Sequence, residues 1–282
     1  CALPIYNSNI EETELKRYLQ STGKYSDELI KKAIFNLQKE ATISSIDDLF
    51  SINKAVYSML RYGTAVRVDA QNQPQTVQFI DWQNPRNNNF AIAEEVTIKD
   101  RKERRPDIVL YINGIAIGVL ELKKASVSVS EGIRQNLSNQ LPQFNMPFFT
   151  TVQLVLAGND SNGLYYGTTK TEEKYFLKWK EGNTSYIPNE VLLDRQIIQF
   201  CTKYRILDLL HNFVLFDFGI KKLCRPNQYF GIKAAQKYLK RNYGGIIWHT
   251  QGSGKSLTFL ANIFDYVLKN PGKGIKAVLV YP

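Results

Sequence analysis

The 282-residue sequence is 44% hydrophobic, which is enough for ordinary packed cores and excludes a chain that is disordered by composition. Lys and Arg outnumber Asp and Glu by 36 to 26, and the resulting net charge of +10 favours a polyanionic partner, nucleic acid above all. No apolar run approaches the roughly 18 residues of a membrane span, so we expect a cytoplasmic protein without a membrane-embedded segment.

The three cysteines, Cys1, Cys201 and Cys224, have no Cys-x-x-Cys spacing, and the two histidines are His211 and His249. We therefore expect reduced thiols, as in a cytosol, and no zinc site. The sequence starts without Met and stops directly after an apolar run, so we expect it to be a piece of a longer chain.

Apolar spacing separates helices from strands along most of the chain. Spacings of three and four predict helices near the N-terminus, over 11–19, 26–39 and 46–61. Strand patterns bounded by turn residues follow at 65–68, 75–80, 90–98, 107–112, 115–123, 152–157 and 165–169. Between these strands, 129–143 is a predicted helix and 81–89 a polar loop. Helix between strands predicts an α/β fold with a mixed sheet over 1–190.

The last third of the chain has a different pattern of apolar residues. Apolar residues on one face predict a helical connector over 191–226. A helix, a strand, a glycine loop, a second helix and a second strand follow, at 227–240, 245–249, 252–256, 257–268 and 276–281. This order is a βαβ unit, so 227–282 is predicted to be the first part of a RecA-like domain with a parallel sheet.

The glycine loop lies between a predicted strand and a predicted helix, where backbone N–H groups can cradle phosphate. Lys255 would reach the β and γ phosphates of ATP, and the Ser256 hydroxyl would hold Mg²⁺. The predicted ATP-binding residues are Thr250, Gln251, Gly252, Ser253, Gly254, Lys255 and Ser256. The only acid after Lys255 is Asp265, in mid-helix, so we expect this piece to bind ATP without hydrolysing it alone.

The loop departs from the general phosphate-loop pattern at one place, because His249 stands where that pattern has its first glycine. The form that remains resembles the phosphate loop of superfamily 2 helicases. Gln228 resembles the glutamine that such motors place before the loop to read adenine. The alternative for Gln228 is an ordinary solvated glutamine on a helix.

Two carboxylates and a lysine stand at the mouth of the predicted hairpin over 107–123, in the pattern PD-x13-ExK. Asp107 opens the first strand, and Glu121 and Lys123 close the second. Mg²⁺ held by Asp107, Glu121 and the Leu122 carbonyl would polarise a phosphate and activate water, and Lys123 would position that water. The alternative is a salt-bridged hairpin mouth without chemistry.

The turn decides whether this metal site can form. A plain two-residue loop at Asn113-Gly114 would place Asp107 and Glu121 on opposite faces of the sheet. A three-residue loop, with Gly114 in a left-handed bulge that pairs Tyr111 with Ile115, would place both carboxylates on one face. We predict that bulge.

With both motifs in view, the chain resembles the motor (restriction) subunit of type I restriction-modification enzymes. The resemblance runs through 79–85, 89–90, 105–114, 121–123 and 248–256. It implies a PD-(D/E)xK nuclease domain fused to a helicase-like motor that translocates double-stranded DNA with ATP and cuts it far from the recognition site. It also implies methyltransferase and specificity subunits as partners. An ATP-gated DNA-binding module with an inactive or structural nuclease centre is the alternative function.

The resemblance also implies a Gln-xxx-Tyr motif on the helix after the hairpin. Its best counterpart is Gln140 with Phe144, which cannot donate a hydrogen bond. Gln140 would then orient DNA or a catalytic group, and a plain polar residue at a helix end is the alternative. Basic residues near the hairpin are predicted to contact DNA phosphates: Lys99, Arg101, Lys102, Arg104, Arg105, Lys124 and Arg134.

Overall fold

The structure, a computed structural model, describes residues 8–43, 48–69, 73–98, 104–182, 191–241, 246, 248 and 250–254. Its α-helices are α1 (Glu12–Ser21), α2 (Asp27–Glu40), α3 (Leu49–Tyr62), α4 (Val129–Asn139), α5 (Leu192–Phe200), α6 (Lys203–Asn212) and α7 (Pro226–Lys240). Short 3-10 helices are η1 (Pro85–Asn87), η2 (Met146–Thr150) and η3 (Glu173–Tyr175). None of these helices has the length and apolar character needed to cross a membrane.

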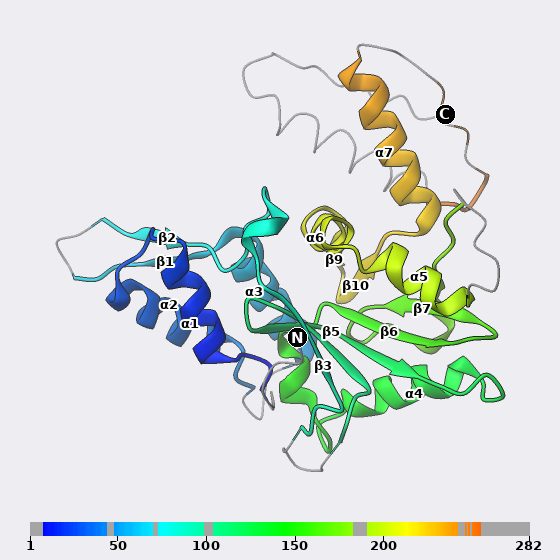
Figure 1. The fold of residues 1–282 in the computed structure, drawn as a ribbon, viewed down its shortest axis with the longest axis horizontal. Helices are drawn as coiled ribbons and strands as arrows, with labels where there is room; N and C mark the ends of the chain where they lie inside the picture. The colour runs from blue at the N-terminus through cyan, green and yellow to red at the C-terminus, as the bar shows by residue number, and fades with distance from the viewer. Residues whose placement is uncertain are drawn as a thin grey trace.

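Six strands form the central sheet, in the order β3-β4-β5-β6-β7-β8 (Figure 1). Their bounds are β3 (Phe90–Glu94), β4 (Ile108–Ile112), β5 (Ile115–Leu122), β6 (Leu154–Asn159), β7 (Gly163–Gly167) and β8 (Leu177–Lys178). Among them only β5 and β6 pair in parallel, because the chain crosses from one to the other through α4. The mixed α/β architecture predicted from the sequence is confirmed.

Both faces of this sheet are covered. One face carries Leu120 and Leu156, which belong to a core shared with α1, α2, α5 and α6. The opposite face carries Val119, which packs in a second core with Ile133 of α4. Residues 115–121 of β5 are therefore all buried, as expected for a strand covered on both sides.

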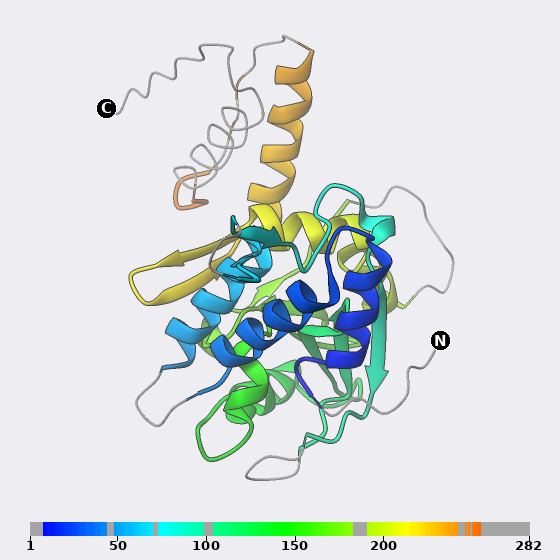
Figure 2. The ribbon, with the colours of Figure 1, turned by 90° about the vertical axis from the view of Figure 1, so that its left-hand side faces the viewer.

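Three helices precede the sheet, as the apolar spacing predicts, and Figure 2 views the fold from their side. The Ser26 side chain caps α2 by accepting a hydrogen bond from the Leu29 N–H. The start predicted for the third helix falls partly on residues outside the described ranges, and α3 begins at Leu49. The two predicted strands that follow are shorter, β1 (Thr64–Val66) and β2 (Gln75–Val77), and form a separate two-stranded sheet.

The turn between β4 and β5 differs from the prediction. Asn113 and Gly114 both have positive φ, 53° and 81°, which is the two-residue turn that Asn-Gly favours in hairpins. Ile112 accordingly pairs with Ile115. The predicted three-residue loop, with Tyr111 paired to Ile115 and a bulge at Gly114, is wrong.

A bulge does occur, but it lies within β5. The register shifts between Leu110 and Tyr111, which pair with Gly118 and Ala116, so Ile117 is one extra residue in β5. Because one residue is inserted, the β5 side chains beyond Ile117 point to the face opposite to the one they would occupy after a two-residue turn alone. From Gly118 onward, the β5 side chains therefore lie on the same faces of the sheet as they would with the predicted bulge at Gly114.

Tertiary contacts explain why the short turn is preferred. The buried Asn113 side chain accepts a hydrogen bond from the Asn89 N–H (2.7 Å) and donates one to the Phe79 carbonyl (2.9 Å). The Gly114 carbonyl accepts from the Glu11 N–H at 2.7 Å, and a Cβ at position 114 would lie 2.8 Å from the Glu11 carbonyl oxygen. The turn is thus clamped by the loop after β2 and by the start of α1.

The predicted helical connector over 191–226 is only partly helical. It contains α5 and α6, split where the Thr202 side chain accepts a hydrogen bond from the Arg205 N–H and caps α6. An unpredicted hairpin follows, β9 (Val214–Asp217) and β10 (Ile220–Leu223). Phe218 and Gly219, with φ of 43° and 78°, form its two-residue turn.

A buried lysine fastens this hairpin to the rest of the fold. The Lys221 Nζ donates hydrogen bonds to the Asn53 Oδ1 (2.7 Å) and to the Gln153 Oε1 (2.6 Å), and the side chain is 4% exposed. Burial lowers the pKa of Lys221 well below its ordinary value. The Asn53 amide in turn donates to the carbonyls of Phe149 and Val152, so one polar cluster joins α3, β10 and the segment before β6.

Replacing Lys221 with Met is expected to lower the free energy of unfolding by about 2 kcal/mol, measured as a shift in the urea midpoint. The substitution leaves the Asn53 and Gln153 side-chain oxygens without their lysine donor, and each unsatisfied buried acceptor costs about 1–3 kcal/mol, partly offset by removal of the buried amine. Lys222→Met is the control. Lys222 forms a half-exposed ion pair with Asp217, so its loss should cost less than about 1 kcal/mol. Equal effects of the two substitutions would contradict the role assigned to Lys221.

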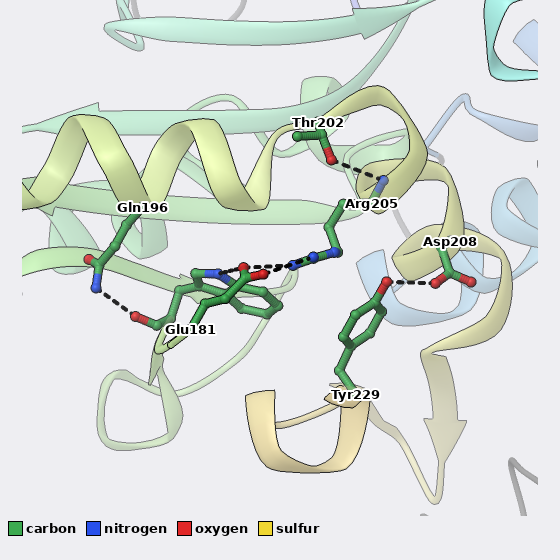
Figure 3. Close-up of polar contacts among 7 residues, drawn as sticks. Glu181, Gln196, Thr202, Arg205, Asp208 and Tyr229 are labelled. Atoms are coloured by element: carbon green, nitrogen blue, oxygen red, sulfur yellow. Dashed lines mark hydrogen bonds and ion pairs between the residues drawn. The ribbon is translucent and has the colours of Figure 1, made fainter. Parts of the chain in front are cut away.

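Helix α7 confirms the helix predicted over 227–240, and it extends away from the sheet in Figures 1 and 2. Its first turn is held by α6 and by the segment after β8 (Figure 3). Arg205 forms a two-bonded ion pair with Glu181, at 3.0 and 3.2 Å, and its guanidinium carbon lies 4.7 Å from the ring centroid of Tyr229. The Tyr229 hydroxyl donates to Asp208 at 2.8 Å.

Candidate active site

The hairpin β4–β5 brings the two predicted carboxylates together. Ile108 pairs with Leu120, so the same register places Asp107 opposite Glu121, with both side chains on the face covered by α4. The Leu122 N–H donates to the Asp107 Oδ2 at 2.6 Å, which fixes this carboxylate at the strand end. The shared face predicted for the pair is therefore present, although the bulge that produces it lies at Ile117.

Glu121 is an unusual carboxyl group for the interior of a sheet. Its side chain is fully buried, and neither carboxylate oxygen accepts a hydrogen bond from the described residues. Burial, together with the nearby negative charge of Asp107, raises the pKa of Glu121 to about 8, although the charge of Lys123 acts in the opposite direction. An interior carboxylate with unsatisfied oxygens beside a second carboxylate matches the needs of a bound cation better than those of a packed core.

Lys123 completes the group on the same face. Its Nζ lies 3.7 Å from the Glu121 Oε2 and donates to the Gln135 Oε1 at 2.8 Å. Helix α4 reaches this close because it presents Gly132 to the strand. A Cβ at position 132 would lie 3.4 Å from the Lys123 Cγ and 3.5 Å from the Glu121 Cβ. The arrangement leaves the ammonium partly exposed beside a buried carboxylate.

Gln135 was not among the residues predicted from the sequence. The predicted glutamine, Gln140, lies at the end of α4, where its amide accepts from the Lys170 N–H (2.7 Å) and donates to the Asn136 carbonyl (3.2 Å). Gln135 instead contacts Lys123 directly. Helical spacing could have indicated it, because Gln135 follows Gly132 by three residues and so lies on the helix face that covers the strand. A role for Gln140 in orienting DNA stays a prediction.

The predicted phosphate-contacting residues are placed in part. Lys99, Arg101 and Lys102 lie outside the described ranges. Arg104 stacks over the Phe144 ring at 4.4 Å, and Arg105 lies 3.9 Å from Glu95. The Arg134 guanidinium forms a two-bonded pair with Glu173, and Lys124 is exposed. Arg134 is therefore already engaged by an acid, whereas the Lys124 side chain is open to solvent.

The side chains present suit one type of metal ion. Among the described residues, no group of three or more His, Cys, Asp or Glu side chains could hold a metal. Two neighbouring carboxylates, Asp107 and Glu121, suit Mg²⁺, which is bound in proteins by one or two carboxylates and completes its six ligands with water and substrate oxygens. The contribution predicted for the Leu122 carbonyl stays a prediction. Asp107 and Glu121 are thus the described residues that could hold a magnesium ion.

The second predicted site is described as far as Gly254. Gln228 is nearly buried, with its Oε1 accepting from the Arg225 N–H (2.8 Å) and its Nε2 donating to the Gly254 carbonyl (3.0 Å). Arg225 also donates to the Gly252 carbonyl at 3.3 Å. The alternative of an ordinary solvated Gln228 is wrong, because this side chain is buried and its amide contacts the glycine loop. Adenine reading by Gln228 stays a prediction.

The other predicted residues of this second site are described only in part. Thr250, Gln251 and Ser253 are described, and the Ser253 N–H donates to the Thr250 carbonyl at 3.3 Å. Lys255, Ser256 and the helix and strand predicted after them lie outside the described ranges. Within the strand predicted over 245–249, Ile246 and Trp248 are described, and neither is in a strand. Both side chains are largely exposed, at 91% and 88%.

Comparison with known proteins adds to this geometry. The family described as "Type I restriction enzyme R protein N terminus" has a model that matches residues 4–174, more than half of the chain. The chain belongs to this family. A second model, for the SWI2/SNF2 ATPase, matches residues 227–280, which include the glycine loop. The family resemblance indicated by the motifs is confirmed.

Curated relatives match over most of this chain. It is 27% identical to the type I restriction enzyme HindI endonuclease subunit of Haemophilus influenzae, over 92% of this chain and 27% of that protein. It is 29% identical to the putative type I restriction enzyme MjaVIIIP endonuclease subunit of Methanocaldococcus jannaschii, over 93% of this chain and 26% of that protein. The chain thus spans about a quarter of the length of these relatives.

Proposed function

We propose that this chain is the nuclease-bearing N-terminal part of a restriction subunit that cuts double-stranded DNA with Mg²⁺ and is coupled to ATP-driven DNA translocation. The observation that carries the proposal is the meeting of Asp107, Glu121 and Lys123 on one face at one end of β4–β5. The Glu121 oxygens, buried and unsatisfied, support it most strongly, because such a group is costly unless a cation compensates it.

Asp107 and Glu121 would hold the magnesium ion. When bound, this ion polarises the scissile phosphate and lowers the pKa of a water molecule, so that hydroxide is available near neutral pH. The ion would also keep Glu121 ionised, since a cation favours the charged form of a neighbouring carboxyl group. Asp107 and Glu121 would therefore fix the position of the ion relative to the scissile phosphate, and burial restricts the Glu121 side chain to one geometry.

Lys123 supplies the positive charge beside this pair. Its ammonium would stabilise the charge that develops on the phosphate oxygens in the transition state, and its contact with Gln135 holds it in place for that task. Gln135 is a positioning residue in this scheme, because it acts through Lys123. Arg104, Arg105 and Lys124 would contact the phosphates of the duplex on either side.

The glycine loop supports the second half of the proposal. Arg225 and Gln228 hold two of its carbonyls, and the SWI2/SNF2 ATPase match extends over the same segment. ATP bound here would drive translocation together with segments of the longer chain. Recognition of the DNA sequence and its methylation would belong to specificity and methyltransferase subunits in a cytoplasmic complex.

A plasmid cleavage assay on the full assembly tests this function. Supercoiled DNA carrying the recognition site should be cut when Mg²⁺ and ATP are both present, and should stay intact with a chelator. Cutting that persists in the chelator would contradict the metal site. DNA binding that responds to ATP without any cutting by the wild-type assembly would favour the alternative, a binding module with a structural hairpin.

A further inference from the structure

A large cleft separates the N-terminal helices from α6 and α7, at the end of the fold opposite the carboxylates. One wall comes from the end of α1 and the loop that follows β2, and the other from α6 and α7 (Figure 1). Asp81 of the first wall follows Phe79, whose carbonyl binds the Asn113 side chain at the turn of β4–β5. The eight residues of β5 therefore put roughly 20 Å between the cleft and Glu121.

The cleft is larger than a typical small-molecule pocket. Its volume is about 1570 Å³, whereas sites for small ligands enclose about 300–1,000 Å³. Polar side chains line most of it. A segment of a polymer fits a cleft of this size better than a single small molecule does. The charge of the lining residues indicates which class of polymer this is.

Positive charge dominates the lining. Five cationic side chains face two carboxylates there, and the carboxylates are already engaged. Asp81 accepts hydrogen bonds from backbone N–H groups of its own loop, and Asp208 pairs with Lys233 at 2.6 Å. Arg205 is paired with Glu181. Within the described part of the chain, no ion pair is found for the three remaining lining cations, Lys24, Arg61 and Lys240.

Arg61 is held ready for an anion. Its Nη1 lies 3.3 Å from the Tyr57 hydroxyl oxygen, and its guanidinium carbon lies 5.3 Å from the Tyr62 ring centroid. These contacts restrict the side chain before any ligand arrives, which lowers the entropy lost on binding. Cations on both walls are what a phosphate backbone requires.

Aromatic rings accompany the cations. Trp82 of one wall and His211 of the other have ring centroids 5.0 Å apart, and both residues line the cleft. On α6, the Tyr204 side chain lines the cleft and is 65% exposed. Rings that remain exposed beside cations are typical of surfaces that stack the unpaired bases of a single strand. A duplex offers such rings no base faces, because its bases are already stacked.

We propose that this cleft binds a segment of single-stranded nucleic acid, with Lys24, Arg61 and Lys240 on the phosphates and Tyr204 stacked on a base. The inference rests on the proposed function only in expecting DNA near this subunit. It places a single strand of nucleic acid between the N-terminal helices and α7, the helix whose first turn contacts the glycine loop. The wall formed by α6 and α7 is fixed for this purpose by Arg205, Tyr229 and Asp208 (Figure 3).

Binding of a labelled oligothymidylate to the full-length subunit, measured by fluorescence anisotropy in a chelator, tests the proposal. Lys24→Ala together with Lys240→Ala should lower the slope of log affinity against log salt by about 1.4, because each phosphate contact to a single strand contributes about 0.7. Tyr204→Ala should weaken binding about fivefold or more. Photocrosslinking of an oligonucleotide carrying 5-bromouracil should label Tyr204.

Matched variants outside the cleft provide the controls. Lys31→Ala with Lys237→Ala removes two exposed lysines that do not line it, and Tyr175→Ala removes a 60% exposed tyrosine elsewhere. Equal losses in control and cleft variants would overturn the proposal. It would also fail if a duplex, or an acidic peptide such as polyglutamate, competed for the cleft as well as the single strand does. Because no cutting is measured, failure of this test is separate from failure of the nuclease proposal.

Discussion

Replacing Glu121 with Gln should reduce DNA cleavage by the full assembly by roughly 100-fold or more. The substitution keeps the shape of the side chain but removes the negative charge that would hold Mg²⁺ beside Asp107. Loss of one group that stabilises developing charge typically costs about 10²–10³ in rate. Initial rates of plasmid linearisation in Mg²⁺ and ATP measure the effect, and DNA binding in a chelator should be unchanged.

Glu131→Gln is the matched control for this experiment. Glu131 lies in the first turn of α4, is exposed, and changes by the same chemistry. Its substitution should leave the cleavage rate within about twofold of wild type, because an exposed charge outside the site has little effect on chemistry there. Cleavage by Glu121→Gln at the wild-type rate would refute the metal site at this hairpin.

The stability of the subunit without Mg²⁺ should fall as the pH rises from about 4.5 to about 8. The folded protein holds the Glu121 proton up to a pKa of about 8, whereas the unfolded chain releases it near the ordinary value of 4.5. Between these values the folded state binds more protons, so each pH unit lowers the free energy of unfolding by about 1.4 kcal/mol, on the order of 5 kcal/mol in all. Above the folded pKa no further loss is expected from this group.

Urea unfolding at a series of pH values in a chelator measures this dependence. Glu121→Gln carries no titrating group at this position, so it should be more stable than wild type at pH 8 and less dependent on pH. Added Mg²⁺ should recover part of the wild-type stability at pH 8, because a ligand that binds the folded state alone shifts the equilibrium. The same pH dependence in wild type and Glu121→Gln would contradict the burial of this carboxyl group.

Long periodic segments were predictable from the sequence because their apolar spacing reports one buried face. Helices α1, α2, α4 and α7 lie close to the ranges that this spacing predicts, and the strand that follows α4 is found as well. In each of them, local pattern and tertiary packing favour the same structure. The mixed sheet followed from the order of these elements, and the family from the combined motifs.

The hairpin turn shows where the sequence was insufficient. Asn-Gly correctly indicated a tight turn, but the position of the bulge depends on how β5 fits against both β4 and β6. Gly118, directly after the extra residue Ile117, is the one local signal of a bulge in β5, because an isolated glycine inside a strand often marks one. The place of the bulge follows from contacts between segments that are far apart in the chain.

Two further misses have the same cause. The hairpin β9–β10 contains consecutive lysines, which look like a solvated surface, but Lys221 is buried against side chains 168 and 68 residues away. Gln135 reads as an ordinary helix residue until Gly132 brings α4 close to Lys123. The partners of Lys221 cannot be identified from neighbouring positions. The spacing of Gln135 from Gly132 indicates the covered face of α4, but Lys123 as its partner follows only from the packing of α4 on β5.

The clamp on the turn of β4–β5 separates two kinds of mutational sensitivity along one hairpin. Asn113 and Gly114 hold one end through α1 and the loop after β2, while Asp107 and Glu121 occupy the other. Changes at the carboxylate end should remove cutting and leave the scaffold intact. Changes at the clamped end should abolish activity by unfolding, although they lie far from the chemistry. A lineage could therefore lose cleavage through single substitutions and still inherit a folded subunit.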